Sequence, residues 1–171
     1  MRRLLVTLCC ATTVLTAQQT RARIGLPGYK DMFPIEDVTL PFTLDAPPAR
    51  SYAAVKAAFA DLKVPVEVDD SAGGIVGTQK TQARINFAGY KLSRLFDCGT
   101  RPMGGANADS FRITMVFLAL LDADGVNRTK LRVGFVGGGE PVGGSAREAV
   151  VCSSSGVIEA KLVELASTHL K

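Results

Sequence analysis

Residues 51–79 change their hydrophobic period from that of a helix to that of a strand. Apolar residues at helical spacing from Tyr52 to Leu62, with alanines between them, predict a helix. Ser51 is its predicted cap, because Pro47 and Pro48 disfavour an earlier start. Valines then alternate with polar residues, a turn with two glycines follows at residues 69–74, and a second strand begins at Ile75. The stretch therefore predicts a helix followed by a β-hairpin.

A second hairpin and a second helix follow later in the chain. Residues 110–121 are the longest strand candidate, and Val116, Leu118 and Leu120 make its second face apolar as well. A strand that is apolar on both faces is typical of the centre of a sheet, or of a strand whose outer face meets a partner. Residues 128–136 predict the returning strand, and residues 157–170 predict a terminal amphipathic helix.

The order helix, hairpin, hairpin, helix predicts an α+β fold, a two-layer sandwich in which two helices cover one face of an antiparallel sheet of about four strands. We expect one domain at residues 46–171. Residues 18–45 contain several prolines and lack helical period, which predicts an extended tether with an edge strand around Pro41. Residues 91–96 predict one helical turn, and residues 137–145 a glycine-rich loop.

The first seventeen residues have the pattern of an export signal. Arg2 and Arg3 precede a short apolar run, and Ala17 is a small residue suited to cleavage. The run is too short and too polar to span a bilayer, so no transmembrane span is expected after cleavage. Cys9 and Cys10 lie inside the run and not after it, which favours secretion over lipid anchoring. The expected location is the bacterial periplasm or cell envelope.

Charge and cysteine content add to this expectation. The chain has 20 basic and 16 acidic residues, and loss of the signal leaves 18 basic residues, too small an excess for a nucleic-acid-binding protein. Cleavage also leaves two cysteines, Cys98 and Cys152, which in an oxidising compartment predict one disulfide. That disulfide closes a loop of about 55 residues and contributes roughly 4 kcal/mol. The alternative is a reactive thiol at Cys98, which has no histidine near it in sequence.

Two motif-like stretches have simpler structural interpretations. Gly138–Ser145 has the glycine spacing of a phosphate-binding loop, but Gly144 stands where the lysine is required, so a flexible connector is predicted. Asp122, Asp124 and Asn127 resemble the start of a calcium loop but lack its later acidic ligand, so a hairpin turn is predicted.

Candidate catalytic and metal-binding residues are few. His169 is the only histidine and lies near the C-terminus, so no histidine-based catalysis, metal site or cofactor site is predicted. An enzyme would have to rely on carboxylates alone, and we expect the protein not to be one. The carboxylates in question are Asp69, Asp70, Asp97 and Asp109.

Basic residues gather between residues 84 and 101, interleaved with aromatic ones. Such a patch is typical of a solvated surface, and it is also suited to anionic lipid headgroups or to a partner. The four residues are Arg84, Lys91, Arg94 and Arg101.

The stretch from Tyr52 to Gln79 resembles the helix-plus-hairpin start of domains in BamC-type lipoproteins of the outer-membrane β-barrel assembly machinery. The shared features are an alanine-rich helix with a V-x-x-x-F pattern, the strand V-P-V-E-V-D-D, a glycine turn and G-I-V-G-T. With F-D-C-G at residues 96–99 and V-C-S-S-S-G at residues 151–156, the chain also looks like small exported bacterial domains of unknown function. The resemblance implies an envelope location.

The leading hypothesis is a non-enzymatic exported envelope domain that acts as a binding or scaffold module for a protein or other envelope partner. Its predicted partner surface is the outer face of Val116, Leu118 and Leu120. The alternative is a carrier or sensor of a small apolar ligand held between the sheet and the helices.

Overall fold

The computed structural model describes residues 22–102, 104–143 and 148–171. The predicted export signal, residues 1–17, lies outside the described residues, as does Gly144 of the glycine-rich stretch.

The centre of the fold is a seven-stranded antiparallel sheet. Its order is β4-β5-β9-β10-β11-β8. Two strands pair with the same edge of β10: β3 with its first half and β11 with its second half. The strands are β3 (Thr39–Leu44), β4 (Val68–Asp70), β5 (Ile75–Ala83), β8 (Phe96–Asp97), β9 (Phe111–Ala123), β10 (Thr129–Pro141) and β11 (Val150–Ser154). The predicted α+β class and antiparallel sheet are confirmed, whereas the predicted number of strands was too small.

Strand β9 lies between β5 and β10 and pairs with β10 over its whole length. Side chains on both of its faces are buried, which fits the prediction that an apolar strand of this kind is central. The edge strand predicted around Pro41 is β3, in which Pro41 lies opposite Arg132. An edge position suits proline because its missing N–H would otherwise leave a ladder hydrogen bond unmade.

Three α-helices occur in the described part of the chain: α1 (Pro48–Asp61), α2 (Leu92–Leu95) and α3 (Val157–His169). The predicted start of α1 was wrong, because Pro48 occupies the first helical turn, where a missing N–H costs nothing. Ser51 is not a cap; it is buried and donates a hydrogen bond to the carbonyl of Ala46. None of the described helices is long and apolar enough to cross a membrane.

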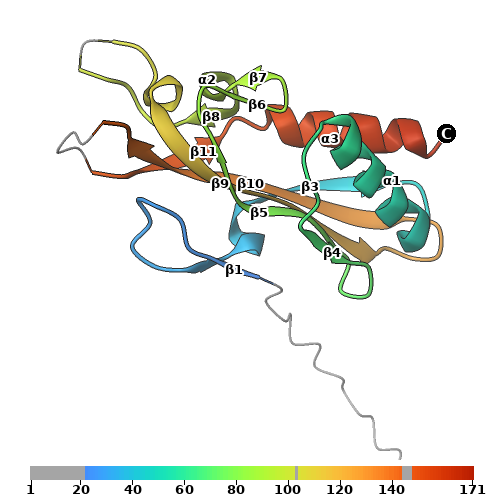
Figure 1. The fold of residues 1–171 in the computed structure, drawn as a ribbon. Coiled ribbons are helices and arrows are strands. Elements are labelled where there is room, and N and C mark those ends of the chain that lie inside the picture. Colours follow the sequence, from blue (N-terminus) through green and yellow to red (C-terminus); the bar gives the residue numbers. More distant parts are fainter. Residues whose placement is uncertain (1–21, 103, 144–147) are drawn as a thin grey trace, which may run out of the picture.

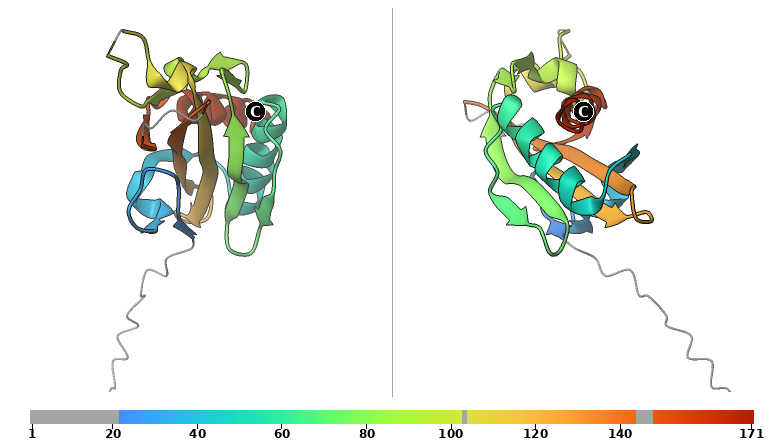
Figure 2. Two further views of the ribbon diagram at one scale, coloured as in Figure 1. Left: turned by 60° about the vertical axis from the view of Figure 1, so that its left-hand side comes forward. Right: turned by 90° about the vertical axis from the view of Figure 1, so that its right-hand side faces the viewer.

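Helices α1 and α3 contact each other, α1 also contacts β5 and β9, and α3 contacts β10 and β3 (Figure 2). Between these helices and the sheet lies a core of aromatic rings. Phe117 and Phe135 lie 5.0 Å apart between ring centroids, with Phe59 4.9 Å from Phe117 and Phe96 4.4 Å from Phe135. These fully buried rings fill the space between sheet and helices.

The opposite face of the sheet is covered by residues 22–38, which we call the N-terminal strap (Figure 1). It contains the short hairpin of β1 (Arg23–Ile24) and β2 (Phe33–Pro34), followed by the 3-10 turn η1 (Ile35–Val38). Its Ile24, Leu26 and Ile35 are at most 5% exposed and pack in one cluster with apolar side chains of β9. The prediction of an extended tether was therefore wrong for residues 22–38. The predicted two-layer sandwich was also wrong, because the strap adds a layer on the second face of the sheet.

Close backbone contacts show why glycines are needed beneath the strap. A Cβ at Gly138 would lie 2.1 Å from the carbonyl oxygen of Pro27, and one at Gly28, whose φ is +83°, would lie 2.5 Å from the backbone of Val150. Only glycine permits backbones to approach this closely. Gly137 to Pro141 thus belong to strand β10, and the prediction of a loop over these residues was wrong.

Candidate binding surfaces

The predicted partner surface on β9 is not accessible. Val116, Leu118 and Leu120 are 2%, 0% and 0% exposed, because the N-terminal strap lies on them. These side chains are apolar because they pack against the N-terminal strap of the same chain. The prediction that they form a surface for a partner was therefore wrong.

The predicted disulfide between Cys98 and Cys152 is present and joins residues 54 positions apart. It links the segment after β8 to strand β11, next to the two backbone pairs between these strands. Both cysteines are buried, at 5% and 0% exposure. A buried disulfide is a structural cross-link, which leaves no thiol at Cys98 for chemistry.

Asp69 belongs to a small hydrogen-bonded network on the surface of α1 and β4. Its carboxylate lies 2.5 Å from Lys56 Nζ and accepts a 2.7 Å hydrogen bond from the hydroxyl of Tyr52. The bond from Lys56, and then that from Tyr52, lower the pKa of Asp69, while burial and the bond to Asp69 raise the pKa of Tyr52. An ionised carboxylate already holding two donors is a poor general base.

A groove of about 560 Å³ lies beside this network. The start of α1, the β4–β5 turn and the end of β9 line it, with Tyr52 on its wall. Asp70 does not act with Asp69, since it accepts a hydrogen bond from Gly73 N–H within the turn. The groove is therefore bordered by a turn and a satisfied network, and the paired-carboxylate arrangement is not formed.

The other acidic candidates also bond to nearby backbone. Asp97 accepts from Gly99 N–H and Asp109 from Ser93 N–H, at 2.9 and 3.2 Å. His169 lies 2.7 Å from Asp61 and ties the end of α3 to the end of α1.

Asp124 and Asn127 of the predicted hairpin turn lie between β9 and β10, and Asp122 lies near the end of β9. Asp124 pairs with Arg128 and Asp122 with Arg132, at 2.9 and 3.2 Å. Within residues 22–102, 104–143 and 148–171, no three His, Cys, Asp or Glu side chains form a group able to hold a metal ion.

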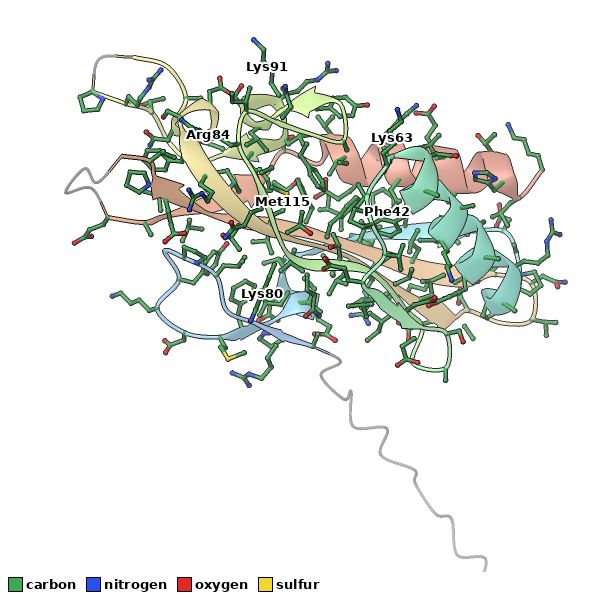
Figure 3. The ribbon with its side chains drawn as sticks, viewed as in Figure 1. Phe42, Lys63, Lys80, Arg84, Lys91 and Met115 are labelled. Atoms are coloured by element: carbon green, nitrogen blue, oxygen red, sulfur yellow. A yellow bond between two sulfur atoms is a disulfide. The ribbon has the colours of Figure 1, made fainter. Side chains whose placement is uncertain are left out.

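A basic surface extends along β5 and into the hairpin of β6 (Asn86–Phe87) and β7 (Tyr90–Lys91). Between Asp70 and Asp97 the sequence contains four basic residues and no acidic one. All four side chains are exposed, and no ion pair among the described residues joins them to a carboxylate. We call this set the basic ridge: Lys80, Arg84, Lys91 and Arg94. Figure 3 labels the first three: Lys80 lies beside the N-terminal strap, and Arg84 and Lys91 lie toward the hairpin.

The backbone along the basic ridge is held in an uncommon conformation. Among the described residues, four other than glycine have positive φ: Lys63, which follows α1, and three that lie between residues 80 and 88. These three are Lys80 (54°), at the bulge of β5, Ile85 (77°) and Ala88 (49°). Positive φ is a steric outlier for a β-branched residue such as Ile85, yet this side chain is 53% exposed. Strain of this kind clusters at functional sites.

Several contacts hold the ridge in place. Leu92 N–H donates a 2.8 Å hydrogen bond to the carbonyl of Ile85, and Leu92 and Phe87 are buried in the core below. Arg94 lies over the ring of Tyr90, 5.3 Å from its centroid, and its carbonyl accepts a hydrogen bond from Ser155. The disulfide at Cys98 fixes the segment that follows the ridge. The cations of the ridge are thus presented on a structured part of the chain.

Three of the four basic residues grouped from the sequence are in the ridge. The fourth, Arg101, lies beyond the disulfide in the loop before η2 (Asn107–Asp109), where a Cβ at Gly105 would touch its guanidinium. Lys80 and Ile85 were missed. The absence of acidic residues between Asp70 and Asp97 was the sequence signal that would have included Lys80.

The burial of Glu159 was also not predicted from the sequence. Although it occupies the first turn of α3 as predicted, it is only 1% exposed, and one of its carboxylate oxygens has no hydrogen-bond partner in the described structure. Burial raises its pKa.

Comparisons of this chain with protein-family models, with curated proteins and with solved structures find no match.

Proposed function

We propose that this chain is a non-enzymatic binding module of the bacterial envelope that binds an anionic partner through its basic ridge. The observation that carries the proposal is the exposure of Lys80, Arg84, Lys91 and Arg94 without an acidic partner. Opposite charges on facing surfaces speed association and select the partner, so a ridge whose four cations form no ion pair within the described part of the chain favours a negatively charged one.

Export is supported by the disulfide and by the sequence pattern of the first seventeen residues. Disulfides persist in the periplasm and in other oxidising compartments but are rare in the cytosol. The alternative function, a carrier of an apolar molecule between sheet and helices, lacks a comparable observation, because closely packed phenylalanine rings occupy that space.

The test is cell fractionation of a bacterium that expresses the full chain. A ridge variant, Arg84→Ala with Lys91→Ala and Arg94→Ala, is compared with wild type after osmotic shock at low salt. We expect wild type to stay with the envelope fraction and the ridge variant to be released. A control variant removes the same charge elsewhere, at exposed lysines: Lys30→Ala with Lys130→Ala and Lys171→Ala.

The expected result for the control variant is retention with the envelope, as for wild type. Retention of the ridge variant to the same extent as wild type would refute the proposal. Recovery of wild type from the cytosol with free thiols would also refute it.

A further inference from the structure

The distribution of charge on the ridge indicates the shape of its partner. Lys80 lies on β5, Lys91 on β7 and Arg94 on α2, so the cations are spread over successive elements and do not converge on one cavity. The described groove lies elsewhere, at the β4–β5 turn. Spread, exposed cations suit an extended array of negative charges better than one small anion, because each contributes separately through long-range attraction.

Ile85 adds an apolar contact in the middle of this charge. It follows Arg84 directly, and the hydrogen bond from Leu92 N–H to its carbonyl places it beside Lys91. An exposed aliphatic side chain flanked by cations matches a membrane interface, where the cations meet headgroups and the apolar side chain reaches the acyl boundary. Tyr90, half-buried beneath Arg94, has the amphipathic ring that occurs at the same depth.

The part of the ridge that holds Arg84, Lys91 and Arg94 is free to meet such a surface, whereas Lys80 lies beside the N-terminal strap (Figure 3). Hairpin β6–β7 lies on the side of the sheet away from the N-terminal strap, which therefore does not cover it (Figure 1). Ile85 is 53% exposed and has a positive φ, at which glycine or asparagine would be the more stable choice.

We propose that the partner of the basic ridge is an anionic lipid surface, with Ile85 entering the interface between Arg84 and Lys91. This inference rests on the proposed function and specifies the chemistry of its partner. Attraction to an anionic leaflet falls about fivefold for each Lys or Arg removed.

The test is co-sedimentation of the exported, disulfide-bonded protein with phosphatidylcholine vesicles that contain increasing amounts of phosphatidylglycerol. We expect binding that rises with phosphatidylglycerol and weakens with salt. The ridge variant should bind about a hundredfold more weakly, and the control variant with the same net charge should bind like wild type.

A second variant separates insertion from charge. Ile85→Asn keeps every cation and tolerates positive φ, so it stays folded, and we expect about tenfold weaker binding to the anionic vesicles. Glycerol phosphate, the free headgroup, should not displace the protein, since a single phosphate cannot replace the array. Displacement by millimolar glycerol phosphate would point to a site for one anion and overturn the inference.

The failure of this inference is distinguishable from that of the proposed function. If the protein binds no vesicles but its retention in the envelope fraction still depends on the ridge, the partner is not a lipid surface. A protein or polysaccharide partner then remains. Loss of both lipid binding and ridge-dependent retention overturns the proposed function as well. Equal vesicle binding by wild type and Ile85→Asn would remove the insertion of Ile85.

Discussion

Gly138→Ala should displace the N-terminal strap from the sheet. The added Cβ would lie 2.1 Å from the carbonyl oxygen and 2.8 Å from the nitrogen of Pro27, and backbone atoms of a paired strand cannot move aside at low cost. The strap must therefore lift at Pro27, and the neighbouring Ile24 and Leu26 leave their contacts with β9.

The size of the effect follows from the buried area that is lost. Ile24 and Leu26 are 4% and 5% exposed in the native fold, and full burial of one such side chain contributes about 1.5–3 kcal/mol. We expect the free energy of unfolding to fall by about 3–6 kcal/mol. Urea denaturation measures this loss, and increased fluorescence of an apolar dye reports the uncovered face of β9.

Gly25→Ala is the matched control, because it adds the same methyl group within the strap. The Cβ there would meet only the flexible side chain of Met32, at 3.3 Å, so stability should change little. If Gly138→Ala were as stable as wild type and bound no dye, the strap would not be a fixed layer of the fold.

Three further results are expected. Replacing Cys98 and Cys152 with alanine should lower the free energy of unfolding by about 4 kcal/mol, since a loop of 54 residues is no longer closed; a urea midpoint equal to that of wild type would contradict this. Because burial raises the pKa of Glu159, its contribution to stability is present below pH 4.5 and is lost as pH rises through its folded-state pKa. Urea midpoints between pH 4 and 8 should show this fall in wild type but not in Glu159→Gln. If the midpoints of the two proteins changed with pH in the same way, this prediction would be refuted. Asp69→Asn should lower the pKa of Tyr52, which is measured by ultraviolet titration of the phenol. An unchanged pKa of Tyr52 would show that Asp69 does not act on this hydroxyl.

Hydrophobic period predicted the helices and the central hairpin because these elements bury one side in a regular repeat. The terminal helix was predicted at residues 157–170 and observed at Val157–His169. The helical turn predicted over residues 91–96 is α2. In each case local pattern and tertiary burial agree.

The strap was missed because its burial has no period. Ile24 and Leu26 are two residues apart, but a turn and two prolines separate them from Ile35, so the three do not form a sustained helical or strand repeat. The apolar second face of β9 correctly indicated that something covers it, but not that the cover comes from the same chain. Glycines of β10 were predicted to be a loop for a related reason: their role is to admit the strap and the side chains around them, a contact that composition cannot show.

The candidate surface was predictable only in part. Clustering of basic residues is visible in sequence, but their exposure without acidic partners and the positive φ of Ile85 are properties of the folded chain. The network of Lys56, Tyr52 and Asp69 likewise joins residues up to 17 positions apart through the packing of α1 against the hairpin.

The most direct test of the central claim is trypsin footprinting of the protein on isolated envelopes. Trypsin cleaves after Lys and Arg, so the exposed residues Lys80, Arg84, Lys91 and Arg94 report on the ridge itself, and Lys30 and Lys130 report on surfaces away from it. We predict that envelope-bound protein is protected at the ridge and is cleaved at Lys30 and Lys130 at the rate of free protein. Cleavage of the bound protein at the ridge as fast as in solution would contradict the account.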